Sequence, residues 1–504
     1  MARTLIRDGY IITASEDYRA DLLIDGETIA AITAPTTSAG QHATGRGESE
    51  RDGVDRVIDA TGLYVLPGGV DVHTHLDMPL PATTTADDFA SGTIAAACGG
   101  TTTVIDFANQ YHGQTLAYAL ETWHRKAAGR AAIDYSFHMT ITDLPHAPAA
   151  AMADMVREGI SSFKLLMAYP GTFMVDDATI YQVLRRASEL GALTCIHAEN
   201  GCVIDLLVRE AVAAGQTAPR YHARTRPAVL EGEATGRAIA LAQLAGAPVY
   251  IVHVSCAAAL ARIQEARARN LPVWGETCPQ YLFLSEEAYQ APDFEAARFV
   301  CTPPLRTRAD ADALWDALAR GDLQTVATDH CSFNFHGQKE LGRDDFTRIP
   351  NGLPGIETRI LLMYSGGVAD GRLGRTNLTS LAQREITTSK RSRWSTATGT
   401  SSNRPLQRFV DVVATTPAKL FGLYPRKGSI MVGGDADLVL FDPAGETVLS
   451  AATHHQRVDY SPYEGLHAHG AIRSVLLRGN LIVANGQFVG QTGQGRFLRR
   501  STLQ

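Results

Sequence analysis

Eight short apolar runs between residues 69 and 329 constrain the fold of this chain more than any other feature. The segments between the runs are longer, and several have a helical pattern, for example residues 87–98, 177–190 and 257–268. Strands that alternate with helices indicate a parallel sheet, and eight such units favour a closed (β/α)8 barrel in the α/β class. The expected strands are residues 69–75, 101–107, 133–140, 162–167, 193–198, 249–254, 273–277 and 325–329.

Both ends of the chain show a different pattern, with short alternating strands and turn signals. The first sixty residues alternate polar and apolar side chains, and Asp25-Gly26 marks a turn between two strands. Short strands return at 436–441 and 475–483. Because the two ends share this pattern and a barrel lies between them, we expect them to meet in one small β-sandwich domain.

These patterns predict the domain organisation. Residues 376–403 are rich in Ser and Thr, carry clustered basic residues and have few apolar side chains, so we expect an exposed insertion there. The other expected parts are an N-terminal β-sandwich segment 1–63, the barrel 64–425, a C-terminal β-sandwich segment 426–486 and a C-terminal tail 487–504.

The overall charge and the cysteine pattern argue against several kinds of partner. A net charge of −7 over 504 residues disfavours nucleic acid and anionic membrane surfaces. No apolar run reaches the length of a transmembrane helix, and the charged start of the chain lacks the apolar core of a signal peptide. The seven cysteines are scattered and form no Cys-x-x-Cys pair, which is typical of reduced core thiols. We expect a cytoplasmic protein.

The first apolar run of the expected barrel ends in His73-Thr-His75. Residues i and i+2 of a strand point to the same face, so both imidazoles are aimed at one point. Two convergent imidazoles make half of a zinc-type site. Taken alone, the pair is equally typical of two hydrogen-bonded histidines at a strand end.

Further polar residues resolve this ambiguity, because they fall at the ends of other runs. The carboxyl ends of barrel strands face one mouth, where active sites are built. Four histidines and one aspartate at that mouth suit two divalent ions, which together lower the pKa of a shared water. The residues at or near these strand ends are His73, His75, Lys164, His197, His253 and Asp329.

The charges of this ligand set are not balanced. One carboxylate against two dications leaves excess positive charge, so a second bridging anion is expected. Lys164 is the candidate, because a buried lysine can become neutral and a neutral amine can add CO₂ to give a carbamate. A carbamate would bring two oxygens and a negative charge, whereas an ammonium would repel both ions.

Ten stretches across nearly the whole chain resemble, in sequence and in order, the dihydropyrimidinase and D-hydantoinase family of cyclic amidohydrolases. The resemblance implies a (β/α)8 barrel, a β-sandwich built from both chain ends and a homotetramer. It also implies hydrolysis of dihydropyrimidines or 5-substituted hydantoins to N-carbamoyl amino acids. The stretches are residues 71–79, 85–89, 163–169, 197–200, 251–256, 276–281, 301–306, 328–334, 349–357 and 458–465.

The resemblance also implies a binuclear zinc site and roles for its ligands. His73, His75 and Asp329 would hold one zinc ion, and His197 and His253 the other. Lys164, carboxylated on its Nζ to N6-carboxylysine, would bridge the two ions.

The resemblance assigns further residues to the substrate. Tyr169 would donate a hydrogen bond to the oxyanion that develops at the attacked carbonyl. Thr302 and Asn351 would bind the amide edges of the ring through their backbone. Asp329 would take a proton from the attacking water and pass it to the leaving nitrogen.

Residues 80–84 and Thr302 depart from the family pattern. Position 302 is Thr where relatives often have Ser, which changes little for a backbone contact. Residues 80–84 stand where relatives usually have Phe and Gly, so the pocket for the ring substituent differs here. From their places in loops at the barrel mouth, we expect Leu80 and Phe173 to line that pocket.

Other readings of the sequence remain at this point. A non-catalytic scaffold like the dihydropyrimidinase-related neuronal proteins would lack several metal ligands, whereas all six positions stand here. An allantoinase or dihydroorotase is the main alternative among enzymes. Dihydroorotases usually place an arginine just after the second histidine, and Leu-Asp-Met follows His75 instead. The sequence does not distinguish dihydropyrimidine from hydantoin as the natural substrate, nor the preferred enantiomer.

Overall fold

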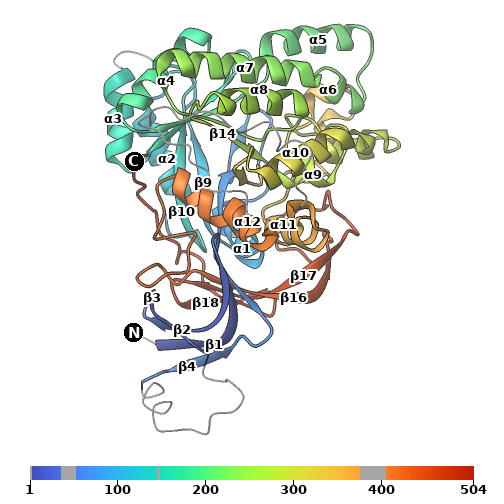
Figure 1. Ribbon diagram of the computed structural model, residues 1–504. Coiled ribbons are helices and arrows are strands. Elements are labelled where there is room, and N and C mark those ends of the chain that lie inside the picture. Colours follow the sequence, from blue (N-terminus) through green and yellow to red (C-terminus); the bar gives the residue numbers. More distant parts are fainter. Residues whose placement is uncertain (1–2, 36–52, 145–147, 375–403, 504) are drawn as a thin grey trace.

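Eight parallel strands form the centre of the molecule (Figure 1). The computed structural model describes residues 3–35, 53–144, 148–374 and 404–503. The strands pair in chain order, and all the predicted barrel runs are confirmed as strands. They are β6 (Gly69–Thr74), β9 (Thr101–Asn109), β10 (Asp134–Thr140), β11 (Ser162–Leu166), β12 (Leu193–His197), β13 (Val249–Ile251), β14 (Val273–Thr277) and β15 (Thr325–Val326).

The last strand of the barrel approaches the first across a narrow seam. Just beyond β15, the backbone of His330 forms a parallel bridge with Thr74 of β6. The His75 backbone N–H donates to the His330 carbonyl over 2.8 Å. The Thr328 hydroxyl donates to the Asp71 carboxylate over 2.7 Å. These contacts nearly close the sheet into the predicted barrel.

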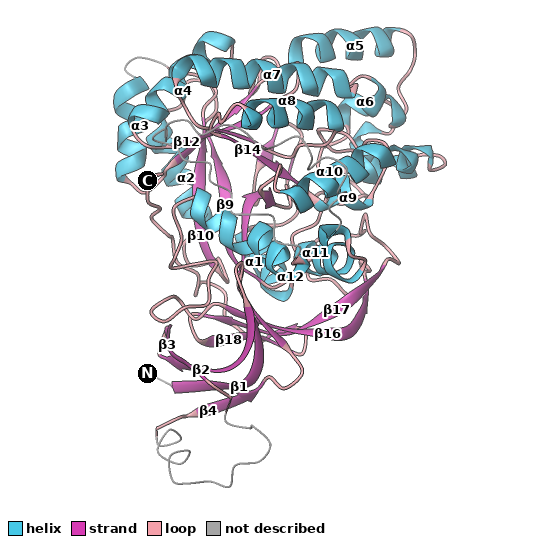
Figure 2. Cartoon of the chain, viewed as in Figure 1, coloured by secondary structure: helices cyan, strands magenta, loops and turns pink. Residues whose placement is uncertain are grey.

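Helices cover the outside of the barrel, between successive strands (Figure 2). Helix α4 shows why they form: Asp176 caps its first turn by accepting from the Thr179 backbone N–H over 2.8 Å. Its buried residues Ile180, Val183, Leu184 and Ala187 follow the helical i, i+3, i+4, i+7 spacing. The principal helices are α1 (Phe89–Cys98), α2 (Leu116–Ala127), α3 (Pro148–Arg157), α4 (Asp177–Glu189), α5 (Gly201–Ala213), α7 (Ala228–Ala245), α8 (Ala257–Ala268) and α10 (Arg308–Arg320).

The two chain ends meet in a second, nine-stranded sheet, as predicted (Figure 1). Its apolar core joins side chains from both ends, including Ile6 and Leu22 with Leu438 and Leu476. The strands are β1 (Arg3–Ile12), β2 (Asp17–Asp25), β3 (Thr28–Thr33), β4 (Arg56–Asp59), β5 (Tyr64–Pro67), β16 (Leu438–Val448), β17 (His467–Leu477), β18 (Asn480–Ala484) and β19 (Gln487–Phe488).

The chain passes from this sheet into the barrel at Gly68. The sequence analysis placed the division between the domains after residue 63; in the structure, β5 pairs with β1 and β16 in the nine-stranded sheet. Gly68 donates its N–H to the Asp437 carbonyl over 2.8 Å. A Cβ at this position would lie 2.1 Å from Thr102 Oγ1, so only glycine lets the chain pass here.

The segment predicted as a C-terminal tail is folded against the barrel. Leu498 donates its backbone N–H to the Tyr135 carbonyl over 2.7 Å. Arg500 is 5 % exposed, and its guanidinium donates to Ser136 Oγ (2.9 Å), Ser162 Oγ (2.8 Å) and the Phe137 carbonyl. These partners lie near the starts of β10 and β11, so the tail covers the end of the barrel opposite the strand ends that carry the histidines.

The remaining predictions have mixed outcomes. All seven cysteines are free thiols; six are buried as predicted, but Cys202 on α5 is exposed. The predicted insertion 376–403 lies outside the described residues. Within the described ranges, no helix combines the length and apolar character needed to cross a membrane.

Arg500→Met should destabilise the protein, because it would leave Ser136 Oγ, Ser162 Oγ and the Phe137 carbonyl without their buried donor. We expect the free energy of unfolding, measured by urea titration, to fall by about 2–3 kcal/mol. Arg499, whose partners are exposed, is the matched control, and Arg499→Met should leave the urea midpoint unchanged. Equal effects of the two substitutions would contradict a structural role for the tail.

Candidate metal centre and catalytic pocket

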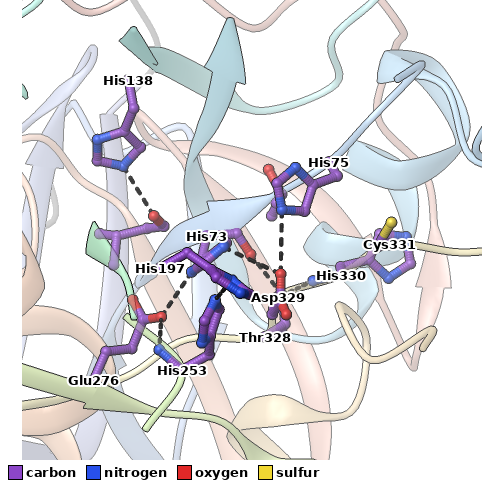
Figure 3. Close-up of polar contacts among 12 residues, drawn as sticks. His73, His75, His138, His197, His253, Glu276, Thr328, Asp329, His330 and Cys331 are labelled. Atoms are coloured by element: carbon purple, nitrogen blue, oxygen red, sulfur yellow. Dashed lines mark hydrogen bonds and ion pairs between the residues drawn. The ribbon is translucent and has the colours of Figure 1, made fainter. Parts of the chain in front are cut away.

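Six potential ligands gather where the barrel strands end, and Figure 3 shows His73, His75, His197, His253 and Asp329 among them. His73 lies in β6 and His75 directly after it, Lys164 lies in β11, and His197 is the last residue of β12. His253 and Asp329 follow β13 and β15 by two and three residues. The alternation of each strand points these side chains inward, toward a common centre.

The Asp329 carboxylate joins two of the imidazoles. Its Oδ1 lies 3.1 Å from His73 Nε2 and 3.2 Å from His75 Nε2. Nitrogen and carboxylate oxygen atoms with this convergence are a donor set suited to a divalent metal ion. Within the described ranges, the ligand atoms of His73, His253 and Asp329 form a cluster in which all lie within 4.8 Å of one another.

The other two imidazoles face each other at the same centre. His197 Nδ1 lies 2.8 Å from His253 Nε2. His197 Nε2 lies 2.9 Å from the Glu199 carboxylate, which holds the ring so that Nδ1 faces His253. Imidazole nitrogens that face one centre in this way can both bind a metal ion. This pair therefore fits a metal.

Lys164 is buried next to the histidines. Its side chain is 4 % exposed, and its Nζ lies 4.8 Å above the centre of the Phe107 ring. Burial lowers the pKa of this amine to about 8. The neutral form that reacts with CO₂ is consequently accessible near physiological pH.

The carboxylates at this centre offset the basic groups. Burial alone would lower the pKa of His73, but Glu276 and Asp329 outweigh burial and raise that pKa to about 9. Burial alone would raise the pKa of Asp329, yet His73 and His75 hold it well below its usual range. Asp329 is thus ionised.

Two buried glutamates support the imidazoles, and our sequence analysis gave them no role. Glu276 of β14 accepts from His73 Nδ1 over 2.7 Å, which leaves Nε2 free to face the metal centre. It also accepts from the Tyr250 hydroxyl (2.8 Å) and the His253 backbone N–H (3.0 Å). Glu199 holds His197 in the same manner. Two signals in the sequence could have indicated these roles. Glu276 is a carboxylate inside a buried strand run, and Glu199 follows the potential ligand His197 by two residues.

Three of these site residues have a left-handed backbone. The φ angles are 68° at Tyr169, 38° at His253 and 50° at Asp329. Residues with a Cβ seldom adopt such angles, and where they do, the surrounding structure holds the strain. Strain concentrated at these residues supports a functional role for them.

All eleven residues predicted for the site line one cavity of about 390 Å³. The Tyr169 side chain lies against those of Thr302 and Asn351, and burial raises the pKa of its phenol, which therefore stays protonated and able to donate. Leu80 and Phe173 form part of the wall. The predicted residues in the lining are His73, His75, Leu80, Lys164, Tyr169, Phe173, His197, His253, Thr302, Asp329 and Asn351.

Glu276→Gln should weaken metal binding by about 10- to 100-fold. The glutamine oxygen can accept from His73 Nδ1 or from the Tyr250 hydroxyl, and its amide group can accept from neither. The metal affinity is measured by competition with a chelator. Circular dichroism should first show that the variant has the same fold as the wild type. Glu265→Gln on the exposed face of α8, where Glu265 pairs with Arg262, should leave the affinity unchanged. A Glu276→Gln variant of unaltered affinity would contradict the supporting role.

Comparisons with known proteins agree with this geometry. The model of the amidohydrolase family matches residues 64–482. The D-hydantoinase of Geobacillus stearothermophilus is 50 % identical over 498 residues, covering 99 % of this chain and 96 % of that protein. The D-hydantoinase of Streptomyces coelicolor is 48 % identical over 503 residues, covering 100 % of this chain and 99 % of that protein. The crystal structure of dihydropyrimidinase from Brevibacillus agri NCHU1002 superposes with a TM-score of 0.89 at 49 % identity, covering 100 % of this chain and 99 % of that one. The chain therefore belongs to the amidohydrolase family, and within it to the dihydropyrimidinase and D-hydantoinase group of cyclic-amide hydrolases.

Proposed function

We propose that this chain hydrolyses the cyclic amide bond of dihydropyrimidines and 5-substituted hydantoins, with two zinc ions, to give N-carbamoyl amino acids. One observation carries the proposal: four imidazoles, the Asp329 carboxylate and the buried Lys164 amine converge in one cavity. Similarity to D-hydantoinases over the whole chain supports it.

In this proposal, His73, His75 and Asp329 would hold one zinc ion, and His197 and His253 would hold the other. Lys164, as the carbamate, would supply a further anionic ligand, and its negative charge would offset part of the charge on the two ions. When bound, the ions polarise the substrate carbonyl and lower the pKa of water at the centre. Burial of Lys164 beside Phe107 supports its conversion to a carbamate.

The side chains of the protein carry the remaining steps. The phenol of Tyr169 donates a hydrogen bond to the carbonyl oxygen as negative charge develops there. Asp329 accepts a proton from the attacking water and delivers it to the ring nitrogen as the carbon–nitrogen bond breaks. Thr302 and Asn351 orient the amide edges of the ring through their backbone groups. Both residues lie in the cavity next to Tyr169, which supports these roles.

The substituent on carbon 5 of the ring faces the apolar wall that contains Leu80 and Phe173. Phe173 lies 6.5 Å from Tyr169 between ring centres, which is close enough to contact a group attached to the bound ring. By the same family resemblance, we propose a homotetramer that works in the cytoplasm.

The test is a set of initial rates on dihydrouracil, hydantoin, a 5-substituted hydantoin and allantoin, using zinc-loaded protein with Asp329→Ala as the inactive control. We expect turnover of the first three substrates and little of allantoin. Preferred turnover of allantoin would replace this proposal with an allantoinase. A folded protein without stoichiometric metal or turnover would indicate a scaffold instead.

Lys164→Ala should lose both metal and activity, and a short carboxylic acid at high concentration should restore a fraction of the activity by filling the gap. Intact-protein mass spectrometry under native conditions should show the wild type heavier by one CO₂. Lys419→Ala, at an exposed lysine beside Tyr424, is the control for the substitution itself. An unmodified Lys164 in a fully active, two-zinc protein would overturn the carbamate.

A further inference from the structure

Arg348 lies at the rim of the catalytic cavity. It is the last residue of the short 3-10 helix η4 (Phe346–Arg348), and its side chain is exposed and lines the cavity. Asn351, which we propose to hold the ring, lies three residues further along the same segment. A group that extends from the bound ring toward solvent therefore passes near Arg348.

The Arg348 guanidinium has no protein partner within the described ranges. The nearby Arg343 pairs with Glu340 over 2.6 Å. The neighbouring carboxylate of Asp345 is already engaged, because it caps η4 by accepting from the Thr347 backbone N–H (2.9 Å) and hydroxyl (2.7 Å). Arg348 is therefore available to a ligand.

The Arg348 guanidinium differs from the other charged groups of the cavity lining in its position. Apart from histidines, the charged residues in the lining are Lys164, Asp329 and Arg348. The first two belong to the metal centre, so among the described residues the rest of the lining has one fixed positive charge and no acidic residue. The same lining contains apolar side chains, including Leu80 and Phe173. The cavity thus suits a short apolar stem that ends in an anion.

We propose that Arg348 binds an anionic end group on the 5-substituent, so that hydantoins with a carboxylate on a short alkyl stem are preferred substrates. This inference rests on the proposed function and names a substrate class for it. The planar guanidinium donates two parallel hydrogen bonds to a carboxylate, a geometry that a neutral amide cannot match.

The test compares 5-(2-carboxyethyl)hydantoin with 5-(2-carbamoylethyl)hydantoin, which has nearly the same shape and no charge. In the wild type, kcat/KM should favour the carboxylate, and added salt should reduce that preference by screening the charges. R348Q should lower the ratio of the two kcat/KM values by roughly two- to fivefold, mainly through KM. R348K should retain part of the preference.

R343Q is the matched control, because Arg343 is an exposed arginine of the same region outside the cavity lining. Its ratio should equal that of the wild type. A ratio that R348Q leaves unchanged, with both hydantoins hydrolysed, would overturn the role of Arg348 and leave the proposed function standing. Failure of zinc-loaded wild type on both hydantoins would overturn the proposed function, and the Arg348 inference with it.

Discussion

Four imidazoles and one amine meet in the buried mouth of the barrel, and this concentration of basic groups is the constraint on which the rest of the structure depends. A buried charge costs several kcal/mol unless a partner offsets it. The barrel therefore brings carboxylates to fixed strand positions: Asp329 between His73 and His75, Glu276 behind His73, and Glu199 behind His197. Each carboxylate fixes the orientation of an imidazole while it balances charge. The same contacts that allow the cluster to be buried thus direct its nitrogen atoms to the metal centre.

The contacts between the last and the first strand of the barrel also hold Asp329 in place. Asp71 accepts from both the backbone N–H (3.1 Å) and the hydroxyl (2.7 Å) of Thr328, the residue before Asp329. Arg359, which is fully buried, donates to the Val326 carbonyl over 3.0 Å on the same strand. Closure of the barrel and the left-handed backbone of Asp329 are therefore fixed by one set of contacts. A carboxylate held in this way need not reorganise when a ligand binds.

The sequence predicted the barrel and the ligands at its mouth because both depend on local patterns. Strand runs have a period of two residues, and polar residues at strand ends face one side. The roles of Glu276 and Arg500 did not follow from such patterns. Glu276 meets His73 across 203 positions, and Arg500 meets Ser162 across 338; only the closed barrel brings these pairs together. Similarly, a local pattern does not separate β5 from β6, because the two form one apolar run in the sequence although they pair in different sheets.

The rim of the cavity and its base are built from different kinds of segment. The base carries the residues proposed for catalysis, and the rim carries those proposed to select the substrate. The residues that we propose as metal ligands stand on or beside barrel strands, whereas Leu80 in the short strand β7 (Pro79–Leu80), Phe173 and Arg348 stand in the segments that connect barrel strands. Those segments still brace one another. Gln338 donates to Thr83 Oγ1 and to the Thr84 carbonyl, both over 2.7 Å, and the Tyr111 hydroxyl donates to the Pro79 carbonyl over 3.0 Å while its ring lies 6.0 Å from Phe173. Because loops tolerate substitution better than barrel strands, the rim can change the accepted substituent while the strand-borne centre keeps its geometry.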